Sequence, residues 1–217
     1  MTIDLNEPPK TRRTLLVRLK DWGDQNSWRE FYDTYWRLIY SVARKAGLSE
    51  QEAEDALQET VISIAKEIGE FKYDPKKGQF KNWLLHQTKW RIADQFRKRQ
   101  RYQHRPSDGS KTELMEQVPD PASVDVPEGL WDEQWHQNLW AVALERVKAQ
   151  VDPRTFQIFQ QHVLKEVPVA KVAKALGVSR TLVYVAKHRI SARLDKELKN
   201  LAKKAAQPPV EALGPSS

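Results

Sequence analysis

The sequence predicts an all-α fold in which two small helical domains are joined by a flexible acidic linker. Apolar residues recur at helical spacing through most of the chain, and a stretch rich in Pro, Ser and Asp interrupts this pattern near the middle. Charge is also segregated along the 217 residues. The expected division is a disordered N-terminus at 1–10, a first domain at 11–104, a linker at 105–133, a second domain at 134–204 and a disordered tail at 205–217.

The net charge of +7 combines segments of opposite sign. Residues 107–140 hold eight acids against one lysine, residues 72–105 hold eleven Lys and Arg against two acids, and residues 165–204 hold eleven against three. Two basic modules around an acidic segment indicate a polyanion bound at two places. The chain has no cysteine, no apolar run near the roughly 20 residues that span a bilayer, and no signal-peptide pattern. We therefore expect a cytoplasmic protein without a membrane partner.

The first domain begins with a short helix expected over 14–22. A second helix follows, and Gly47 ends it. At its start, Ser27 and Glu30 have the spacing of a capping box. Large apolar residues repeat along it at helical spacing, and we expect them to be core because aromatic rings bury much area. They are Trp28, Phe31, Tyr32, Tyr35, Trp36, Ile39, Val42, Ala43 and Ala46.

An acidic helix comes next, with a second capping-box pair, Ser49 and Glu52, at its start and Gly69 at its end. Its apolar arc comprises Ala53, Leu57, Thr60, Val61, Ile64 and Ile68. The opposite arc comprises Asp55, Gln58, Glu59 and Ile62. A carboxylate-rich surface with an outward isoleucine indicates a contact surface for another macromolecule.

A loop at 70–79 carries Lys76 and Lys77 and leads into a basic helix that begins near Phe80. The expected buried arc of this helix is Leu84, Leu85, Thr88, Ile92 and Phe96. The expected outer arc is Trp83, Gln87, Trp90, Arg91, Arg97 and Lys98. Aromatic rings interleaved with cations suit unstacked bases, because rings stack on bases while cations contact phosphates.

After the linker, a helix rich in tryptophan is expected to pack its rings, including Trp131, Trp135 and Trp140, on the second domain. Asp152 and Pro153 predict the start of the next helix. From Val167 to Ala202 the pattern is typical of a helix-turn-helix, with a turn at Gly177, a cap at Ser179, and Val183, Ala186, Ile190 and Leu194 as the inner stripe. The outward residues Arg180, Thr181 and Tyr184 are base-reading candidates, and Lys187 and His188 share their face.

Three other functions fit parts of this pattern. A stand-alone repressor or activator would use only the helix-turn-helix. A metal-dependent nuclease could use Asp55 and Glu59, but no histidine or third acid accompanies them, and His188 has no second histidine near it. An RNA-binding protein would use the aromatic face and has no need of a major-groove helix. The sequence predicts a protein that is not an enzyme and that has no metal site and no cofactor.

The segment Ala53–Glu59, the segment Phe80–Leu84 and the run Arg97–Arg99 resemble region 2 of sigma-70-type transcription initiation factors. The helix-turn-helix resembles region 4, and the chain has no room for a third domain between them. This combination is similar to the extracytoplasmic-function (ECF) subgroup. The resemblance covers about Thr11–Arg101 and Trp140–Leu201.

The resemblance implies a factor that binds core RNA polymerase and directs it to promoter DNA. It assigns Asp55, Gln58, Glu59 and Ile62 to the β′ clamp. It assigns to the −10 element, melted and held as a single strand, Lys76, Lys77, Phe80, Lys81, Trp83, Gln87, Trp90, Arg91, Arg97 and Lys98. It assigns to the −35 element Arg180, Thr181, Tyr184, Lys187 and His188, with a further contact between region 4 and the β flap. It also implies an anti-sigma regulator.

The sequence departs from the family pattern at two positions in the basic helix. Trp90 stands where asparagine is common, and Gln87 stands where an aliphatic residue is usual. Because these positions belong near the pocket for a flipped base, the promoter preference of the family does not transfer to this chain. We expect Trp90 to stack on an unpaired base.

Overall fold

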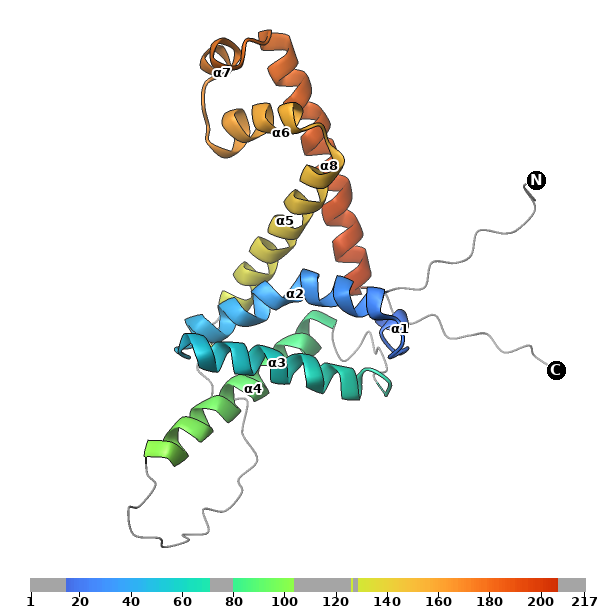
Figure 1. The fold of residues 1–217 in the computed structure, drawn as a ribbon, viewed down its shortest axis with the longest axis vertical. Coiled ribbons are helices and arrows are strands. Elements are labelled where there is room, and N and C mark those ends of the chain that lie inside the picture. Colours follow the sequence, from blue (N-terminus) through green and yellow to red (C-terminus); the bar gives the residue numbers. More distant parts are fainter. Residues whose placement is uncertain (1–14, 71–79, 104–125, 127–128, 207–217) are drawn as a thin grey trace, which may run out of the picture. The chain divides into compact units, whose positions relative to one another are not determined.

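The computed structural model describes residues 15–70, 80–103, 126 and 129–206. Every regular element in these ranges is a helix, which confirms the predicted all-α class (Figure 1). The chain divides into two compact units, and the second is Gly129–Lys203. The predictions for 1–10, for the loop with Lys76 and Lys77, for most of the acidic linker and for the tail beyond residue 206 lie outside the described residues.

The N-terminal unit contains α1 (Leu15–Arg18), α2 (Gln25–Lys45), α3 (Glu50–Glu67) and α4 (Phe80–Gln103). Helix α3 packs on both α2 and α4 (Figure 1). Apolar side chains at helical spacing fill the space between them, which is why these segments fold as helices and pack together. The fully buried members include Phe31, Ile39, Ile64, Leu84 and Ile92.

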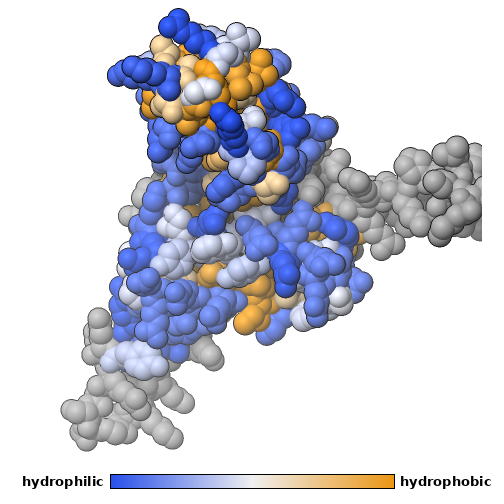
Figure 2. Space-filling model, turned by 45° about the horizontal axis from the view of Figure 1, so that its top comes forward, coloured by the Kyte–Doolittle hydropathy of each residue, from blue (hydrophilic) through white to orange (hydrophobic). Residues whose placement is uncertain are grey.

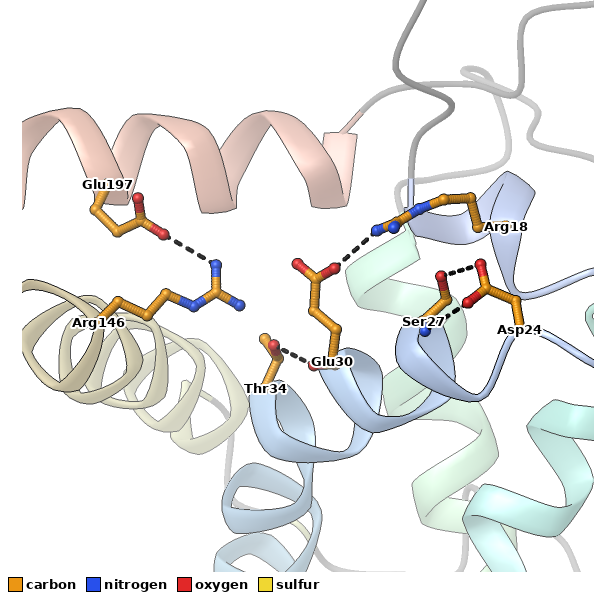
Figure 3. A network of polar contacts seen from close by, with 7 residues as sticks. All are labelled: Arg18, Asp24, Ser27, Glu30, Thr34, Arg146 and Glu197. Carbon is orange, nitrogen blue, oxygen red and sulfur yellow. Dashed lines mark hydrogen bonds and ion pairs between the residues drawn. The ribbon is translucent and has the colours of Figure 1, made fainter. Parts of the chain in front are cut away.

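The start of α2 differs from the expected capping box. Asp24 is the N-cap, and its carboxylate accepts hydrogen bonds from the Ser27 backbone N–H at 3.0 Å and from the Ser27 hydroxyl at 2.5 Å. Glu30 instead accepts a hydrogen bond from Arg18 at 2.7 Å, which fastens α1 to α2 (Figure 3). The prediction of Ser27 as the cap was wrong because an aspartate three residues earlier makes the same N-terminal bond.

The aromatic stripe of α2 is also less buried than predicted. Phe31 and Tyr35 are in the core, whereas Tyr32 is exposed. The Tyr32 ring stacks on Trp36 with centroids 6.4 Å apart, and the Arg37 guanidinium lies 5.2 Å from the centre of a Trp36 ring. Helical spacing placed Tyr32 beside core residues, but the ring lies at the edge of the buried arc and packs along the helix surface.

The capping box at the start of α3 is confirmed. The Ser49 N–H donates to Glu52 Oε2 at 2.8 Å, and the Glu52 N–H donates to Ser49 Oγ at 3.3 Å. Glu52 also accepts a hydrogen bond from Arg99 Nε at 2.7 Å and a second one from the Arg99 guanidinium. Mainly because of the bonds from Arg99, the pKa of Glu52 falls from 4.5 to about 2.

The second unit contains α5 (Leu130–Gln150), α6 (Pro153–Phe159), the π-helical turn η2 (Gln160–Leu164), α7 (Val169–Leu176) and α8 (Arg180–Ala206). Helix α5 begins inside the segment expected to be linker, because Trp131 and Trp135 are buried and make this first part of the helix core. Trp140 is exposed, so only two of the three predicted rings pack inward.

Two polar contacts fasten α8 to α5. Arg146 donates a hydrogen bond to Glu197 at 2.9 Å (Figure 3), and Arg193 donates to the Gln150 carbonyl at 3.2 Å. Asp152 caps α6 by accepting from the Thr155 N–H, which confirms the predicted start at Pro153. The two contacts thus hold α5 against the long α8, whose first turns belong to the helix-turn-helix.

We expect Glu52→Gln to lower the free energy of unfolding by about 1–2 kcal/mol at neutral pH, since a partly buried charge-assisted pair is lost. The folded pKa of about 2 lies below the ordinary 4.5, so ionised Glu52 stabilises the fold above pH 4.5. That contribution disappears as the pH falls through about 2. Urea denaturation followed by circular dichroism at both pH extremes measures the gap between the two proteins. A gap of constant size would contradict the assignment, and Glu54→Gln, exposed on the same helix, is the control.

Candidate nucleic-acid interface

The outer face of α3 presents the predicted acidic surface. Asp55 and Gln58 are exposed, and Ile62 exposes 53% of its surface although it is a large apolar residue. The capping box at Ser49 fixes where the helix begins, and Ala53, Leu57 and Ile64 bury the opposite face. An exposed isoleucine bordered by polar and acidic side chains is a surface suited to a partner protein.

Glu59 differs from Asp55 and Gln58 because it has a partner in the other predicted site. Its carboxylate accepts a hydrogen bond from Lys98 of α4 at 2.5 Å, and Lys98 lies 3.5 Å from Asp94. Burial lowers the pKa of Lys98, but the bonds and charges of Glu59 and Asp94 outweigh this and raise it overall. The ammonium group therefore stays charged, and the acidic and basic surfaces meet at this pair.

Three successive cations near the end of α4 are paired with acids. Arg97 donates to Asp94 at 2.6 Å, Lys98 to Glu59, and Arg99 to Glu52. Sequence reasoning missed Asp94, although its position three and four residues before Arg97 and Lys98 is the usual spacing for ion pairs on a helix. Phosphate groups that bind this end must compete with three carboxylates.

The two tryptophans expected to hold bases are both half-buried on α4. Trp83 lies against Phe80, with ring centroids 5.7 Å apart. The Trp90 indole N–H donates to His86 Nε2 at 3.1 Å, and the two rings meet edge to face. Lys81 and Arg91 are also half-buried. Helix α4 thus carries two rings that are each partly accessible and oriented by an aromatic neighbour.

Two residues assigned to the −10 element point inward, and one of them, Gln87, was predicted for the outer face. Phe80 is fully buried and its ring lies 5.5 Å from Tyr35, so it belongs to the core. Gln87 exposes only 7%, and its amide bonds Ser63 at 3.1 Å and Glu67 at 2.5 Å. The expected outward orientation of Gln87 was wrong because α3 supplies a buried polar partner at that position.

Ser63 is the centre of this polar network. Its hydroxyl lies 3.0 Å from Glu67 Oε1 and 3.1 Å from Gln87 Oε1, and it accepts a hydrogen bond from Arg91 at 2.9 Å. Sequence reasoning missed Ser63, since a serine in an amphipathic helix carries no mark of its partners. The network fixes the orientation of Arg91 beside Trp90.

The helix-turn-helix forms as predicted. Gly177 ends α7 with a φ of 62°, and Ser179 Oγ accepts from the Leu182 N–H at 3.1 Å at the start of α8. The pair is packed by a core of Ile158, Val172, Ala173, Val183 and Ala186. The five residues assigned to the −35 element are all exposed on α8, namely Arg180, Thr181, Tyr184, Lys187 and His188.

The described part of the chain contains neither a candidate metal site nor a candidate membrane span. Within it, no group of three or more acidic or histidine side chains is placed to hold a metal ion. The described helices include none that is both long enough and apolar enough to cross a membrane. Asp55 and Glu59 therefore gain no third ligand from the described residues.

Comparison with known proteins finds a family match and a similar solved structure. The sigma-70 region 2 family model matches residues 31–102, which span α2, α3 and α4. A solved structure of CnrH in complex with the cytosolic domain of CnrY is similar with a TM-score of 0.33 and 16% identity, and the match covers 86% of this chain and 96% of that one. No curated protein sequence matches the chain.

The N-terminal unit is therefore similar to sigma-70 region 2 over residues 31–102. The three predicted motifs of the resemblance, Ala53–Glu59, Phe80–Leu84 and Arg97–Arg99, all lie within the matched residues.

We expect Ser63→Ala to lower the free energy of unfolding by about 1–3 kcal/mol, because the buried groups of Gln87 and Arg91 lose a partner. Thermal or urea denaturation measures the loss. Gln51→Ala on the same helix is a matched control, since Gln51 is exposed and alanine favours helix. A Ser63→Ala protein as stable as the parent would show that the network contributes nothing.

Proposed function

We propose that this chain is a transcription initiation factor of the ECF type that binds core RNA polymerase and directs it to promoters. The observation that carries the proposal is the region 2 match over 31–102, which includes both the acidic face of α3 and the aromatic and basic face of α4. The helix-turn-helix in the second unit supplies a second DNA contact. In this proposal, the acidic face of α3 binds the polymerase, and the aromatic and basic face of α4 binds DNA.

The acidic face of α3 is the proposed contact with the β′ clamp. Asp55 and Gln58 are exposed, Ile62 offers apolar area, and Glu59 lies at the edge where α4 begins to contribute. A mixed surface of this kind has an apolar centre and polar surroundings, as protein interfaces do. The second unit is the proposed contact with the β flap, and an anti-sigma regulator stays a prediction from the family resemblance.

The outer face of α4 is the proposed site for the −10 element as a single strand. Opening base pairs without ATP costs roughly 1–2 kcal/mol per stacked step. Stacking a base on an aromatic ring returns about 1–3 kcal/mol. Trp83 and Trp90, together with cations from Lys81 and Arg91, can therefore offset a few opened steps. The remainder comes from phosphate neutralisation and polymerase contacts, and in this proposal Phe80 and Gln87 support the face from the core side.

The −35 element is the proposed ligand of α8. Its exposed residues Arg180, Thr181 and Tyr184 lie in the first two turns, where helix-turn-helix proteins contact base edges. Lys187 and His188 lie one turn further along. The reading of a stand-alone regulator needs only this unit and leaves the two faces of the N-terminal unit without a role.

We expect Asp55→Lys to weaken association with core RNA polymerase about tenfold or more, through charge reversal at the centre of the contact. Asp55 is the better target because reversing Glu59 also breaks its pair with Lys98. Binding is measured with purified core enzyme, and transcript output with run-off assays. Asp33→Lys makes the same charge change at an exposed position of α2, outside the proposed contact, and is the control. Unchanged association in Asp55→Lys would sink the polymerase assignment.

We expect Trp90→Ala to reduce open-complex formation about 5- to 150-fold, as the loss of roughly 1–3 kcal/mol of base stacking predicts. Trp90→Phe keeps a ring and should retain most of the activity. Permanganate footprinting of unpaired thymines on the same promoter measures opening. Trp22→Ala, which removes an exposed tryptophan elsewhere, is the control. Equal opening by the alanine and parent proteins would dispose of the stacking role.

A further inference from the structure

Helix α8 carries two apolar side chains on its outer surface that its core does not use. Leu182 exposes 43% and Val185 exposes 42% of their surface. The inner stripe is complete without them, since it consists of the buried residues Val183, Ala186, Ile190 and Leu194. A ligand that covers these two branched aliphatic residues would remove their exposed apolar area from water, which is favourable.

The two residues form one patch at the start of α8. They are three positions apart and therefore neighbours on the helix surface. Figure 2 shows apolar surface among hydrophilic surface in the upper part of the molecule, where Figure 1 places α7 and the start of α8. The patch lies in the two helical turns that enter the major groove in a helix-turn-helix.

The charges around the patch indicate what covers it. Arg180, Lys187, Arg189 and Arg193 are exposed on α8, and residues 180–194 contain no acid. Cations on both sides of an apolar patch favour a polyanion with apolar groups on its surface. Duplex DNA meets this description, because thymine places a C5-methyl group in the major groove between two phosphate strands.

We propose that Leu182 and Val185 read thymine bases of the bound duplex through contact with their C5-methyl groups. This inference rests on the proposed function of the second unit and adds a specificity to it. Hydrogen bonds to neighbouring bases come from Arg180, Thr181 and Tyr184. The two aliphatic side chains select thymine by apolar contact, without a hydrogen bond. Sequence reasoning left both residues out of the site.

The experiment removes the methyl group from DNA and the side chain from the protein, separately and together. Duplexes are selected from a random library by the full-length chain bound to core RNA polymerase. Each selected thymine is then replaced by uracil, which lacks only the methyl group. For the parent protein, replacement at a contacted position is expected to weaken binding about fourfold, the effect of one buried methyl group.

The two alanine variants should each lose this response at one position. Val185→Ala and Leu182→Ala bind the thymine duplex about fourfold more weakly than the parent does, and each becomes indifferent to uracil at the base it contacted. Both residues are exposed and alanine favours helix, so the fold is kept, as circular dichroism verifies. Asn200→Ala, exposed near the far end of α8, keeps the parent affinity and its uracil response.

A uracil penalty that persists unchanged in both variants overturns the inference and leaves the proposed function intact. Full DNA affinity in both variants does the same, and indicates a protein partner for the patch. If no duplex is selected, the inference falls together with the DNA-binding role of the second unit. Polymerase association of the same preparation then shows whether the role of the N-terminal unit survives.

Discussion

The contact between α3 and α4 is the constraint on which the N-terminal unit depends. Helix α4 ends in a dense run of cations, which repel one another and would fray the helix if left alone. Glu52 and Glu59 of α3, with Asp94 of α4, offset that repulsion through ion pairs to Arg99, Lys98 and Arg97. Because Glu52 and Glu59 come from the helix that also carries Asp55 and Ile62, the proposed polymerase face and the proposed DNA face lie on one packed pair of helices.

This arrangement has an electrostatic consequence for the proposed function. Lys98 cannot give its full charge to a phosphate while Glu59 accepts its hydrogen bond. A polymerase that engages the carboxylate of Glu59 weakens that competition and makes Lys98 a better phosphate ligand. Under the proposed function, the pair would therefore link occupation of the acidic face to DNA affinity at the basic face, and would keep DNA binding weak in the free protein.

Helical periodicity and capping rules predicted much of the fold. The buried arc of α3 and the inner stripe of α8 follow from spacing alone, and Ser49 and Asp152 begin their helices as local rules require. The errors arise where a partner is distant in sequence. Gln87 is polar and was placed outside, yet Ser63 lies 24 residues away and satisfies it in the core. No local pattern shows such a pairing, nor the one between Glu59 and Lys98.

Leu182 and Val185 were left out of the predicted site for a different reason, which lies in the local sequence rather than in a distant partner. An apolar residue in a helix is ordinarily assigned to the core, and a strongly apolar stretch such as the start of α8 leaves little contrast between its two faces. Only the exposed area separates Val183, which is buried, from its neighbour two residues on. In a protein that binds a duplex, this apolar exposure matches a feature of the ligand, because thymine is the one base with a methyl group in the major groove. Helical spacing therefore predicted the outward polar residues of α8, whereas the exposed area of Leu182 and Val185 is visible only in the structure.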